Sequence, residues 1–178
     1  MENTVIKRLT EQNERCIKSG RYTGKPTGAL RRRLASGQKP YAVVIGCSDS
    51  RVIPEILFDA EPGELFVIRT AGNTVGRTEL ASVDYALHHL GVTTVIVLGH
   101  TRCGAVAGAL AGEFEGPVGA ITKKIARAVG RETDPTEASR RSAVFTARAL
   151  RRTLHADALT VVPALYDVVS GKVTWITE

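Results

Sequence analysis

The run VVIGCSDSRV, residues 43–52, gives the clearest indication of the fold, because an apolar segment passes directly into a thiol, an acid and a base. Residues 41–46, YAVVIG, have the continuous apolar character of a strand buried on both faces of a sheet. Cys47, Asp49 and Arg51 follow at alternating positions. Ligands of open parallel sheets bind beyond the carboxyl ends of the strands, so the run indicates a site as well as a strand.

Outward from this run, strand and helix periodicities alternate along the chain. This order predicts an α/β fold: a mainly parallel four-stranded sheet with an antiparallel edge strand, flanking helices and an N-terminal helical arm. The last two strands are expected to form a hairpin. The predicted strands are 41–46, 64–70, 93–99, 158–167 and 172–177, and the predicted helices are 4–17, 30–35, 78–90, 103–112 and 140–154.

Length and composition predict one domain over residues 1–178, with an arm and linker at 1–37 and an α/β core at 38–178. A chain of 178 residues that is 43% apolar buries enough surface to fold without a disulfide or a metal. The net charge of +6 and an aromatic content of 5% argue against nucleic acid as a partner. No segment approaches the roughly 18 apolar residues of a membrane span.

The cysteines and the first residues favour a cytoplasmic protein. Cys16, Cys47 and Cys103 are an odd number of widely separated thiols, which does not suggest a disulfide framework. The opening residues, MENTVIKRLTEQNERC, lack an apolar core of signal-peptide length. We therefore expect free thiols that are available for chemistry.

Two of these thiols fall near a histidine that also ends a strand. His100 follows the strand at 93–99, and Cys103 lies three positions later, in the first turn of the next helix. If the strands before Cys47 and His100 are neighbours, the three side chains converge. Two thiolates and one imidazole are a zinc set of the catalytic kind, with a fourth position open. The soft sulfurs argue against magnesium and calcium, and they favour zinc while leaving iron as an alternative.

Each of these residues also has a simpler interpretation. A cysteine at a strand end is often a small buried hydrophobe. Asp49 needs a partner when buried, and a structural pair with Arg51 that shapes the turn would satisfy it. That pair is compatible with a catalytic role.

Two longer blocks carry a family resemblance. GCSDSRVIPEILFDAEPGELFVIRTAGN, residues 46–73, followed by GHTRCGAV, residues 99–106, resembles the β-class carbonic anhydrases. The resemblance is detailed from Gln38 to Ala111 and looser in the first helix and in LYDVVSGKV near the end of the chain.

The resemblance implies a lyase that catalyses zinc-dependent reversible hydration of carbon dioxide to bicarbonate and a proton, by attack of zinc-bound hydroxide. Cys47, His100 and Cys103 would hold one zinc ion per chain, and Asp49 with Arg51 would form a catalytic dyad beside it. The fourth zinc ligand can be water or Asp49 in such proteins, and both alternatives stay open. The resemblance also implies a homodimer, in which the terminal helix embraces the partner, or a tetramer built from dimers.

Substrate-binding positions follow from the same resemblance. Gln38 would hydrogen-bond the substrate, and Phe66 and Tyr85 would form the apolar wall of its pocket. Gly104 is a candidate because of its place: its amide comes just after Cys103, near a helix start, where a developing anion is favoured. The alternatives are a polar loop residue for Gln38 and core packing for the two aromatic rings. The adjacent His88 and His89 are candidates for a proton relay, or simply surface residues.

The sequence also departs from the family pattern. Thr70 stands where asparagine is common, and residues 112–159 match weakly, which puts the oligomer contacts in doubt. Two rival functions follow from the same residues. One is hydrolysis of carbon disulfide or carbonyl sulfide on this scaffold, and the other is a redox couple of Cys47 and Cys103, or a structural zinc, in a regulatory module.

Overall fold

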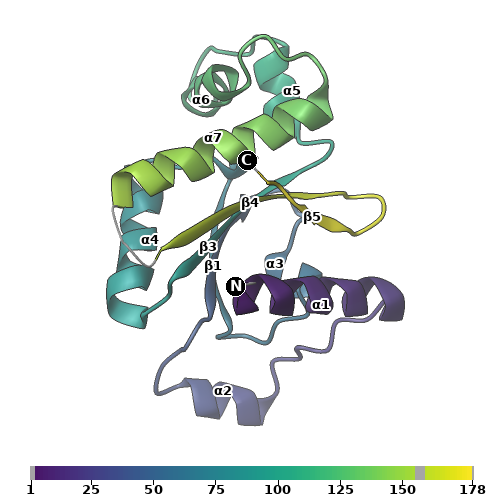
Figure 1. Cartoon of the computed structure of the whole chain (residues 1–178), viewed down its shortest axis with the longest axis vertical. Helices are drawn as coiled ribbons and strands as arrows, with labels where there is room; N and C mark the ends of the chain where they lie inside the picture. Colours follow the sequence, from purple (N-terminus) through teal and green to yellow (C-terminus); the bar gives the residue numbers. More distant parts are fainter. Residues whose placement is uncertain (1–2, 155–158, 178) are drawn as a thin grey trace.

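A five-stranded sheet forms the centre of the computed structural model, which describes residues 3–154 and 159–177 (Figure 1). Its strands are β1 (Ala42–Cys47), β2 (Leu65–Thr70), β3 (Thr94–His100), β4 (Thr160–Tyr166) and β5 (Val173–Trp175). The strand order is β2-β1-β3-β4-β5, with all pairs parallel except β4 and β5. The predicted α/β fold with an antiparallel edge is confirmed. Ala158, the first residue of the predicted strand 158–167, lies outside the described residues.

The helices connect these strands and cover both faces of the sheet. They are α1 (Thr4–Ser19), α2 (Gly28–Leu34), α3 (Pro54–Leu57), α4 (Arg77–Leu90), α5 (Gly104–Leu110), α6 (Gly119–Val129) and α7 (Pro135–Leu154), with a 3₁₀ turn, η1, at Ala71–Asn73. The sequence did not predict α3 or α6, and α7 begins at Pro135 rather than at residue 140. No helix within the described ranges combines the length and the apolar character that crossing a membrane requires.

Alternate residues of the central strands pack in opposite directions. Val44 and Ile96 face α1 and α3, where they meet Leu9 and Phe58. On the other face, the neighbouring strand residues pack against α4 and α7. Every residue of β1 and β3 is buried, which explains why both strands have continuous apolar sequences. Full burial of one such aliphatic side chain stabilises the fold by about 1.5–3 kcal/mol.

The N-terminal helix is anchored on its own chain by Asn13, a polar residue within an otherwise apolar stripe. The Asn13 amide nitrogen donates to the carbonyl oxygens of Leu57 and Gly171, both at 3.0 Å. Its side-chain oxygen accepts the Val173 amide, also at 3.0 Å. These bonds hold α1 against its own chain, whereas Ile17, at the end of the apolar stripe, is 43% exposed.

A third apolar cluster lies at the carboxyl ends of the parallel strands. Cys47 and Cys103 pack there with Val106 of α5, Ile125 of α6 and Ala138 of α7. In Figure 1, α5 and α6 lie together at the end of the molecule opposite α2. These helices shield the strand ends from solvent, and so they create the buried setting of the site.

Candidate metal centre

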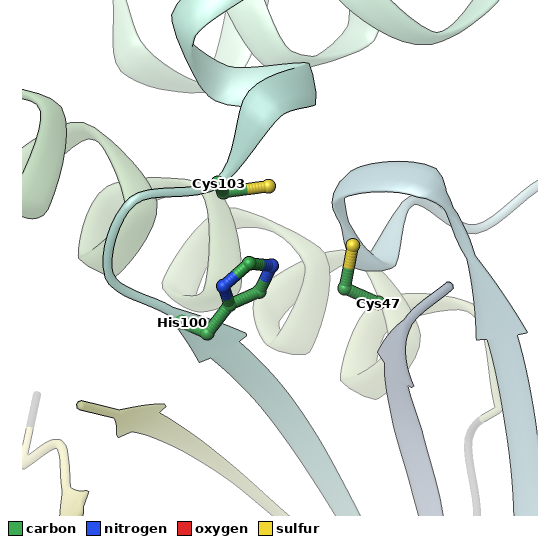
Figure 2. Close-up of side chains that lie close together, drawn as sticks. All are labelled: Cys47, His100 and Cys103. Carbon is green, nitrogen blue, oxygen red and sulfur yellow. The ribbon is translucent and has the colours of Figure 1, made fainter. Parts of the chain in front are cut away.

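Three side chains converge at the carboxyl ends of two neighbouring strands (Figure 2). Cys47 is the last residue of β1, His100 is the last residue of β3, and Cys103 is the N-cap of α5. β1 and β3 pair in parallel, as the predicted convergence requires. The two sulfurs and a ring nitrogen lie within 4.8 Å of one another, and none of the three residues is more than 4% exposed.

The hydrogen bond of His100 determines which of its nitrogens can bind a cation. Its Nδ1 lies 2.9 Å from the carbonyl oxygen of Thr101. A carbonyl oxygen only accepts, so Nδ1 carries the proton and Nε2 keeps its lone pair. Nε2 is buried without a hydrogen-bond partner among the described residues. An unsatisfied buried acceptor costs about 1–3 kcal/mol, and coordination of a metal ion would remove that cost.

The two thiols shift each other's pKa in opposite directions. Donation from Cys103 is the main cause that lowers the pKa of Cys47 to about 4, against the opposing effect of burial. The amides of Asp49 and Gly72, which donate to the sulfur of Cys47, act in the same direction. The shared hydrogen bond, followed by burial, raises the pKa of Cys103. A nearby cation would favour ionisation of both sulfurs.

These donors fit zinc. Zinc accepts two thiolates and one imidazole as three protein ligands, which leaves a fourth position for water or substrate. The hydrogen bond from Nδ1 to a backbone carbonyl is the usual outer contact of a histidine that binds metal through Nε2.

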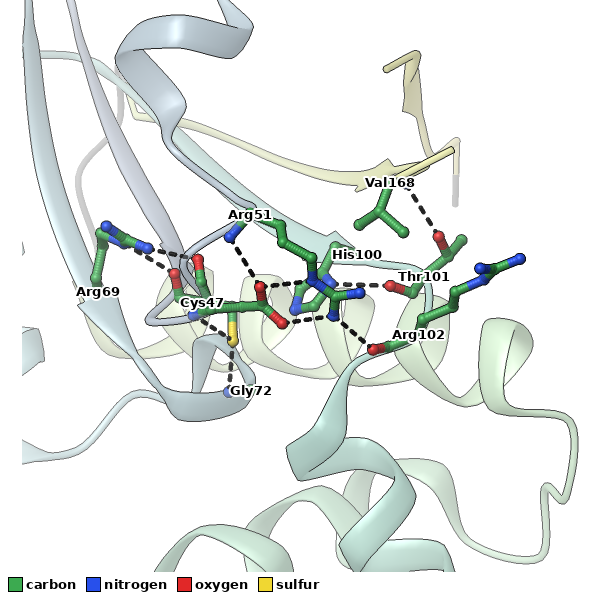
Figure 3. Close-up of polar contacts among 9 residues, drawn as sticks. Cys47, Arg51, Arg69, Gly72, His100, Thr101, Arg102 and Val168 are labelled. Atoms are coloured by element: carbon green, nitrogen blue, oxygen red, sulfur yellow. Dashed lines mark hydrogen bonds and ion pairs between the residues drawn. The ribbon is translucent and has the colours of Figure 1, made fainter. Parts of the chain in front are cut away.

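Asp49 and Arg51 form an ion pair on the loop that follows β1. Figure 3 labels Arg51 and shows its contacts. Arg51 Nε donates to Asp49 Oδ1 at 2.9 Å, and Arg51 Nη2 donates to Oδ2 at 2.7 Å. These guanidinium bonds, with the Arg51 amide, lower the pKa of Asp49 below its usual range. Arg51 Nη2 also donates to the Arg102 carbonyl at 3.1 Å, which ties the dyad to the loop that carries His100 and Cys103.

Two positioning residues were not predicted from the sequence. Arg69 Nε donates to the carbonyl oxygen of Cys47 at 2.9 Å, and its Nη2 donates to that of Asp49 at 2.7 Å. Gly72 donates its amide to the sulfur of Cys47 at 3.2 Å. It has φ +66°, and an added Cβ would lie 2.6 Å from Ile125 Cδ1. Both residues lie within the block that carried the resemblance, but only the folded backbone brings them to the site.

The Thr101 carbonyl that orients His100 is itself held by the neighbouring chain segment. The Thr101 amide donates to the Tyr166 carbonyl at 2.9 Å. Its hydroxyl accepts the Val168 amide at 3.2 Å. Arg102, next in the loop, adopts φ +57°, a left-handed conformation that costs a non-glycine residue about 1–2 kcal/mol. The backbone of this loop is therefore strained at Arg102, between the candidate ligands His100 and Cys103.

The expected pocket residues lie in two different places. Gly104 is the first residue of α5, directly after Cys103. Phe66 pairs with Val43, four residues before the pair of Cys47 and Thr70, so it lies about 13 Å along the sheet from the cluster. Its ring is 6.3 Å from that of Tyr85, which is 48% exposed.

Gln38 is exposed and precedes the amino end of β1. Within one chain, Gln38, Phe66 and Tyr85 thus lie toward the end of the sheet away from the metal cluster. Their substrate-binding role stays a prediction, as does that of Gly104. The proposed relay histidines are exposed on α4, where His88 pairs with Asp84 at 3.3 Å and His89 stacks on Tyr85 at 4.7 Å.

A mainly parallel sheet, covered on both faces and carrying a buried Cys₂His cluster at its strand ends, defines an α/β protein with a metal site of the catalytic kind. Comparison with known families identifies the family to which the chain belongs. Residues 42–173 match the model of the carbonic anhydrase family, and the chain belongs to that family, in its β class.

Individual relatives agree with this assignment. A carbonic anhydrase 2 of Mycobacterium tuberculosis is 46% identical over 110 residues, which cover 62% of this chain and 53% of that protein. A carbonic anhydrase of Pseudomonas aeruginosa is 53% identical over 89 residues, or 46% of this chain and 40% of the relative. The chain therefore spans about half the length of the relatives that it matches.

Solved structures resemble the chain over nearly its whole length. A β-carbonic anhydrase of Aspergillus fumigatus superposes with a TM-score of 0.75 at 25% identity, over 97% of this chain and 88% of that one. One of two tetrameric β-carbonic anhydrases of Sordaria macrospora gives a TM-score of 0.72 at 26% identity, over 99% and 98%. The similarity includes the helices outside the region of highest sequence identity.

Proposed function

We propose that this chain is a carbonic anhydrase that uses one zinc ion to convert carbon dioxide and water into bicarbonate and a proton. The observation that carries the proposal is the buried cluster in which two cysteine sulfurs and a ring nitrogen of His100 lie within 4.8 Å of one another. Nε2 of His100 is buried there and has no hydrogen-bond partner among the described residues. The carbonic anhydrase relatives support the same assignment.

Cys47, His100 and Cys103 would hold the zinc. Zinc supplies, when bound, a Lewis acid that lowers the pKa of water from 15.7 to about 7 and so makes a nucleophile available at neutral pH. The Gly72 amide donates to the sulfur of Cys47 and stabilises its thiolate form. The Thr101 carbonyl keeps Nε2 of His100 free of a proton. The protein thus presents the Cys47 thiolate and the unprotonated Nε2 of His100, and Cys103 would give up its proton when the metal binds.

Asp49 would act as the hydrogen-bond acceptor that orients the attacking water. The lowered pKa of Asp49, caused mainly by Arg51, keeps this carboxylate ionised in the neutral range. An ionised carboxylate only accepts hydrogen bonds, so it directs a water proton toward itself and a lone pair away. Arg51 holds the carboxylate in place through two guanidinium bonds, and Arg69 fixes the backbone on which the acceptor stands.

We further propose that the chain assembles as a homodimer or as a tetramer of two dimers, and that it works in the cytoplasm. The Sordaria relatives are tetrameric, which supports assembly beyond the monomer. Phe66 and Tyr85 lie too far along the sheet to reach the metal cluster of their own chain, so a pocket role for them requires a second copy. The three free cysteines support a reducing compartment.

Stopped-flow measurement of carbon dioxide hydration, combined with zinc analysis of the same sample, tests the proposed activity. We expect hydration far above the buffer rate, in proportion to zinc content, across neutral and mildly alkaline pH. A fully zinc-loaded sample that hydrates carbon dioxide no faster than buffer would contradict the proposal. Assays of the same sample with carbonyl sulfide and carbon disulfide separate the hydrolase alternative.

A further inference from the structure

A groove of about 520 Å³ lies between the start of α4, one side of α6 and the middle of α7. We call it the α4–α6–α7 groove. Its lining includes none of Cys47, His100 and Cys103, so it is separate from the metal centre. Its volume falls within the range of about 300–1,000 Å³ that is typical of small-molecule sites.

The charges that line this groove are all positive. Arg77, Lys123, Lys124 and Arg127 contribute to the lining, which contains no acidic residue. Lys124 Nζ donates to the Val75 carbonyl at 3.3 Å. The other three cations form no ion pair within the part of the chain that the structure describes. Cations gathered around one opening repel each other, and an anion placed between them would reverse that energy.

Glu79, the acidic residue nearest in sequence to the groove lining, already accepts a hydrogen bond. Glu79, in the first turn of α4, accepts the amide of Gly76 at 2.7 Å through Oε2. Its carboxylate therefore caps its own helix. Its single negative charge lies beside Gly76 and offsets part of the positive charge, but the four cations of the lining outnumber it.

The rest of the lining suits an apolar ligand body with a few polar atoms. Leu80, Phe145 and Leu150 line the groove, and the Phe145 side chain is 38% exposed although it is large and apolar. Ser142 and Thr146, both under 9% exposed, also contribute to the lining. Their hydroxyls make no hydrogen bond with any residue that the structure describes. Such hydroxyls can donate to, or accept from, a bound molecule.

We propose that the α4–α6–α7 groove binds a small organic anion: a carboxylate carried on an alkyl or aryl body. The carboxylate pairs with the cations of α6 and Arg77, and the body covers Leu80 and Phe145. A neutral molecule of the same shape leaves the cations unpaired, and an inorganic anion leaves the apolar lining exposed. Both should therefore bind more weakly than the combined ligand.

The same chain segments contribute to the groove and to the surroundings of the metal centre. The chain runs directly from Gly72, whose amide binds the sulfur of Cys47, to Thr74 and Val75 in the groove lining. α6 supplies cations to the groove and places Ile125 in the apolar cluster around Cys47. None of the metal ligands lines the groove, so the anion site is separate from the metal centre.

Isothermal titration of the zinc-loaded chain with three probes tests the site. We expect octanoate to bind one-to-one, and octanamide and inorganic phosphate to bind at least about tenfold more weakly. The double substitution Lys123→Gln with Arg127→Gln should weaken octanoate binding at least about tenfold. Arg131→Gln removes an exposed cation just after α6, outside the groove lining, and should change nothing.

A second variant blocks the groove without changing its charge. Ala149→Trp places a large ring on the lining and should abolish octanoate binding. Circular dichroism checks that the fold is kept. The charge variants alter only exposed side chains, so they test the site even if the tryptophan variant does not fold.

Three results would each overturn the proposal. Octanoate affinity that is unchanged in the charge variant places its binding elsewhere, for example at the metal. Equal affinity for octanamide shows an apolar surface without anion selectivity. A lower molar mass of the charge variant in light scattering shows that the groove is an interface between copies of the chain.

Discussion

The two ends of the central sheet are built in opposite ways. At the carboxyl end, Cys47, His100 and Cys103 are almost completely buried, and hydrogen bonds orient His100 and Cys47. Toward the amino end, Gln38 and Tyr85 are exposed, and the polar atoms of their side chains make no hydrogen bond with any residue that the structure describes.

This difference indicates at which end of the sheet a single chain fixes the positions of its functional groups. At the carboxyl end, the backbone of two parallel strands and the bonds of Arg69 determine the position of each donor before any ligand arrives. At the amino end, the ring of Phe66 packs against the core beneath α4 and lies 6.3 Å from the ring of Tyr85, which is 48% exposed. The predictions below test whether function depends on the first end far more than on the second.

Substitution of a metal ligand should have the largest effect. Cys103→Ser replaces a thiolate by a hydroxyl that does not ionise at neutral pH, so we expect a loss of zinc affinity greater than about 100-fold, with activity lost in parallel. Zinc analysis and stopped-flow hydration measure both. Cys16→Ser is the matched control, because its partly exposed thiol lies on α1 and should leave zinc and activity unchanged. Full zinc occupancy in Cys103→Ser would refute the ligand assignment.

The loss of the dyad acid should separate binding from catalysis. Asp49→Ala keeps all three metal ligands, so zinc content should stay at the level of the unaltered chain while kcat falls about 100-fold or more. Because Arg51 lowers the pKa of Asp49, the unaltered carboxylate is charged at all pH values above that lowered pKa. The deficit should therefore be equally large at mildly acidic and at alkaline pH. Asp84→Ala, on exposed α4, serves as control.

Removal of the backbone brace should have a smaller effect on the same end. Arg69→Gln loses the bonds to the carbonyls of Cys47 and Asp49, so we expect kcat to fall about 10-fold and zinc affinity to weaken by a similar factor. Arg69→Lys, with one donor group, should recover part of both. Arg32→Gln, on exposed α2, controls for the lost charge. A normal kcat with reduced thermal stability alone would show that Arg69 is merely structural.

Two glycines at the carboxyl end of the sheet allow a direct comparison of the effect of alanine on stability. Gly72→Ala forces a side chain into φ +66° and against Ile125, which should cost about 1–3 kcal/mol of unfolding free energy. Gly104→Ala meets no atom within 4 Å and keeps the amide, so its effect should stay within about 0.5 kcal/mol. Urea unfolding measures both. Equal losses in the two variants would contradict the close packing around Gly72.

The smallest effect is expected at the amino end. Tyr85→Ala should raise KM by no more than about tenfold, with kcat and zinc content unchanged, since lost binding alone does not alter the chemical step. Val169→Ala, at another largely exposed apolar position, gives the baseline. A fall in kcat as deep as that of Asp49→Ala would erase the contrast between the two ends.

The metal cluster could be predicted from the sequence because its signals are local. The strands that end in Cys47 and in His100 can be predicted from their continuous apolar composition. Parallel pairing brings the carboxyl ends of such strands together. Arg69 and Gly72 could not be found in this way. Arg69 reaches Cys47 because β2 pairs with β1 in a register that places it beside Gly46, and a register is not written in either strand alone.

Sequence patterns could have predicted two features of the fold, namely α6 and the start of α7. In α6, Ile121, Ile125 and Val129 recur every fourth residue, the spacing of a helical face. At the start of α7, the side chain of Asp134 accepts the Glu137 amide at 2.7 Å, ahead of a proline that suits a first helical turn. Tertiary packing explains what no local pattern shows, namely that Asn13 of α1 joins α3 to the final hairpin.

The central claim is that Cys47, His100 and Cys103 bind one zinc ion and leave one position open. X-ray absorption at the zinc edge of the purified protein tests it directly. The geometry predicts two sulfurs at about 2.3 Å, one imidazole nitrogen at about 2.0–2.1 Å and one oxygen at a similar distance. A first coordination sphere made only of sulfur and nitrogen, or with fewer than two sulfurs, would contradict the account.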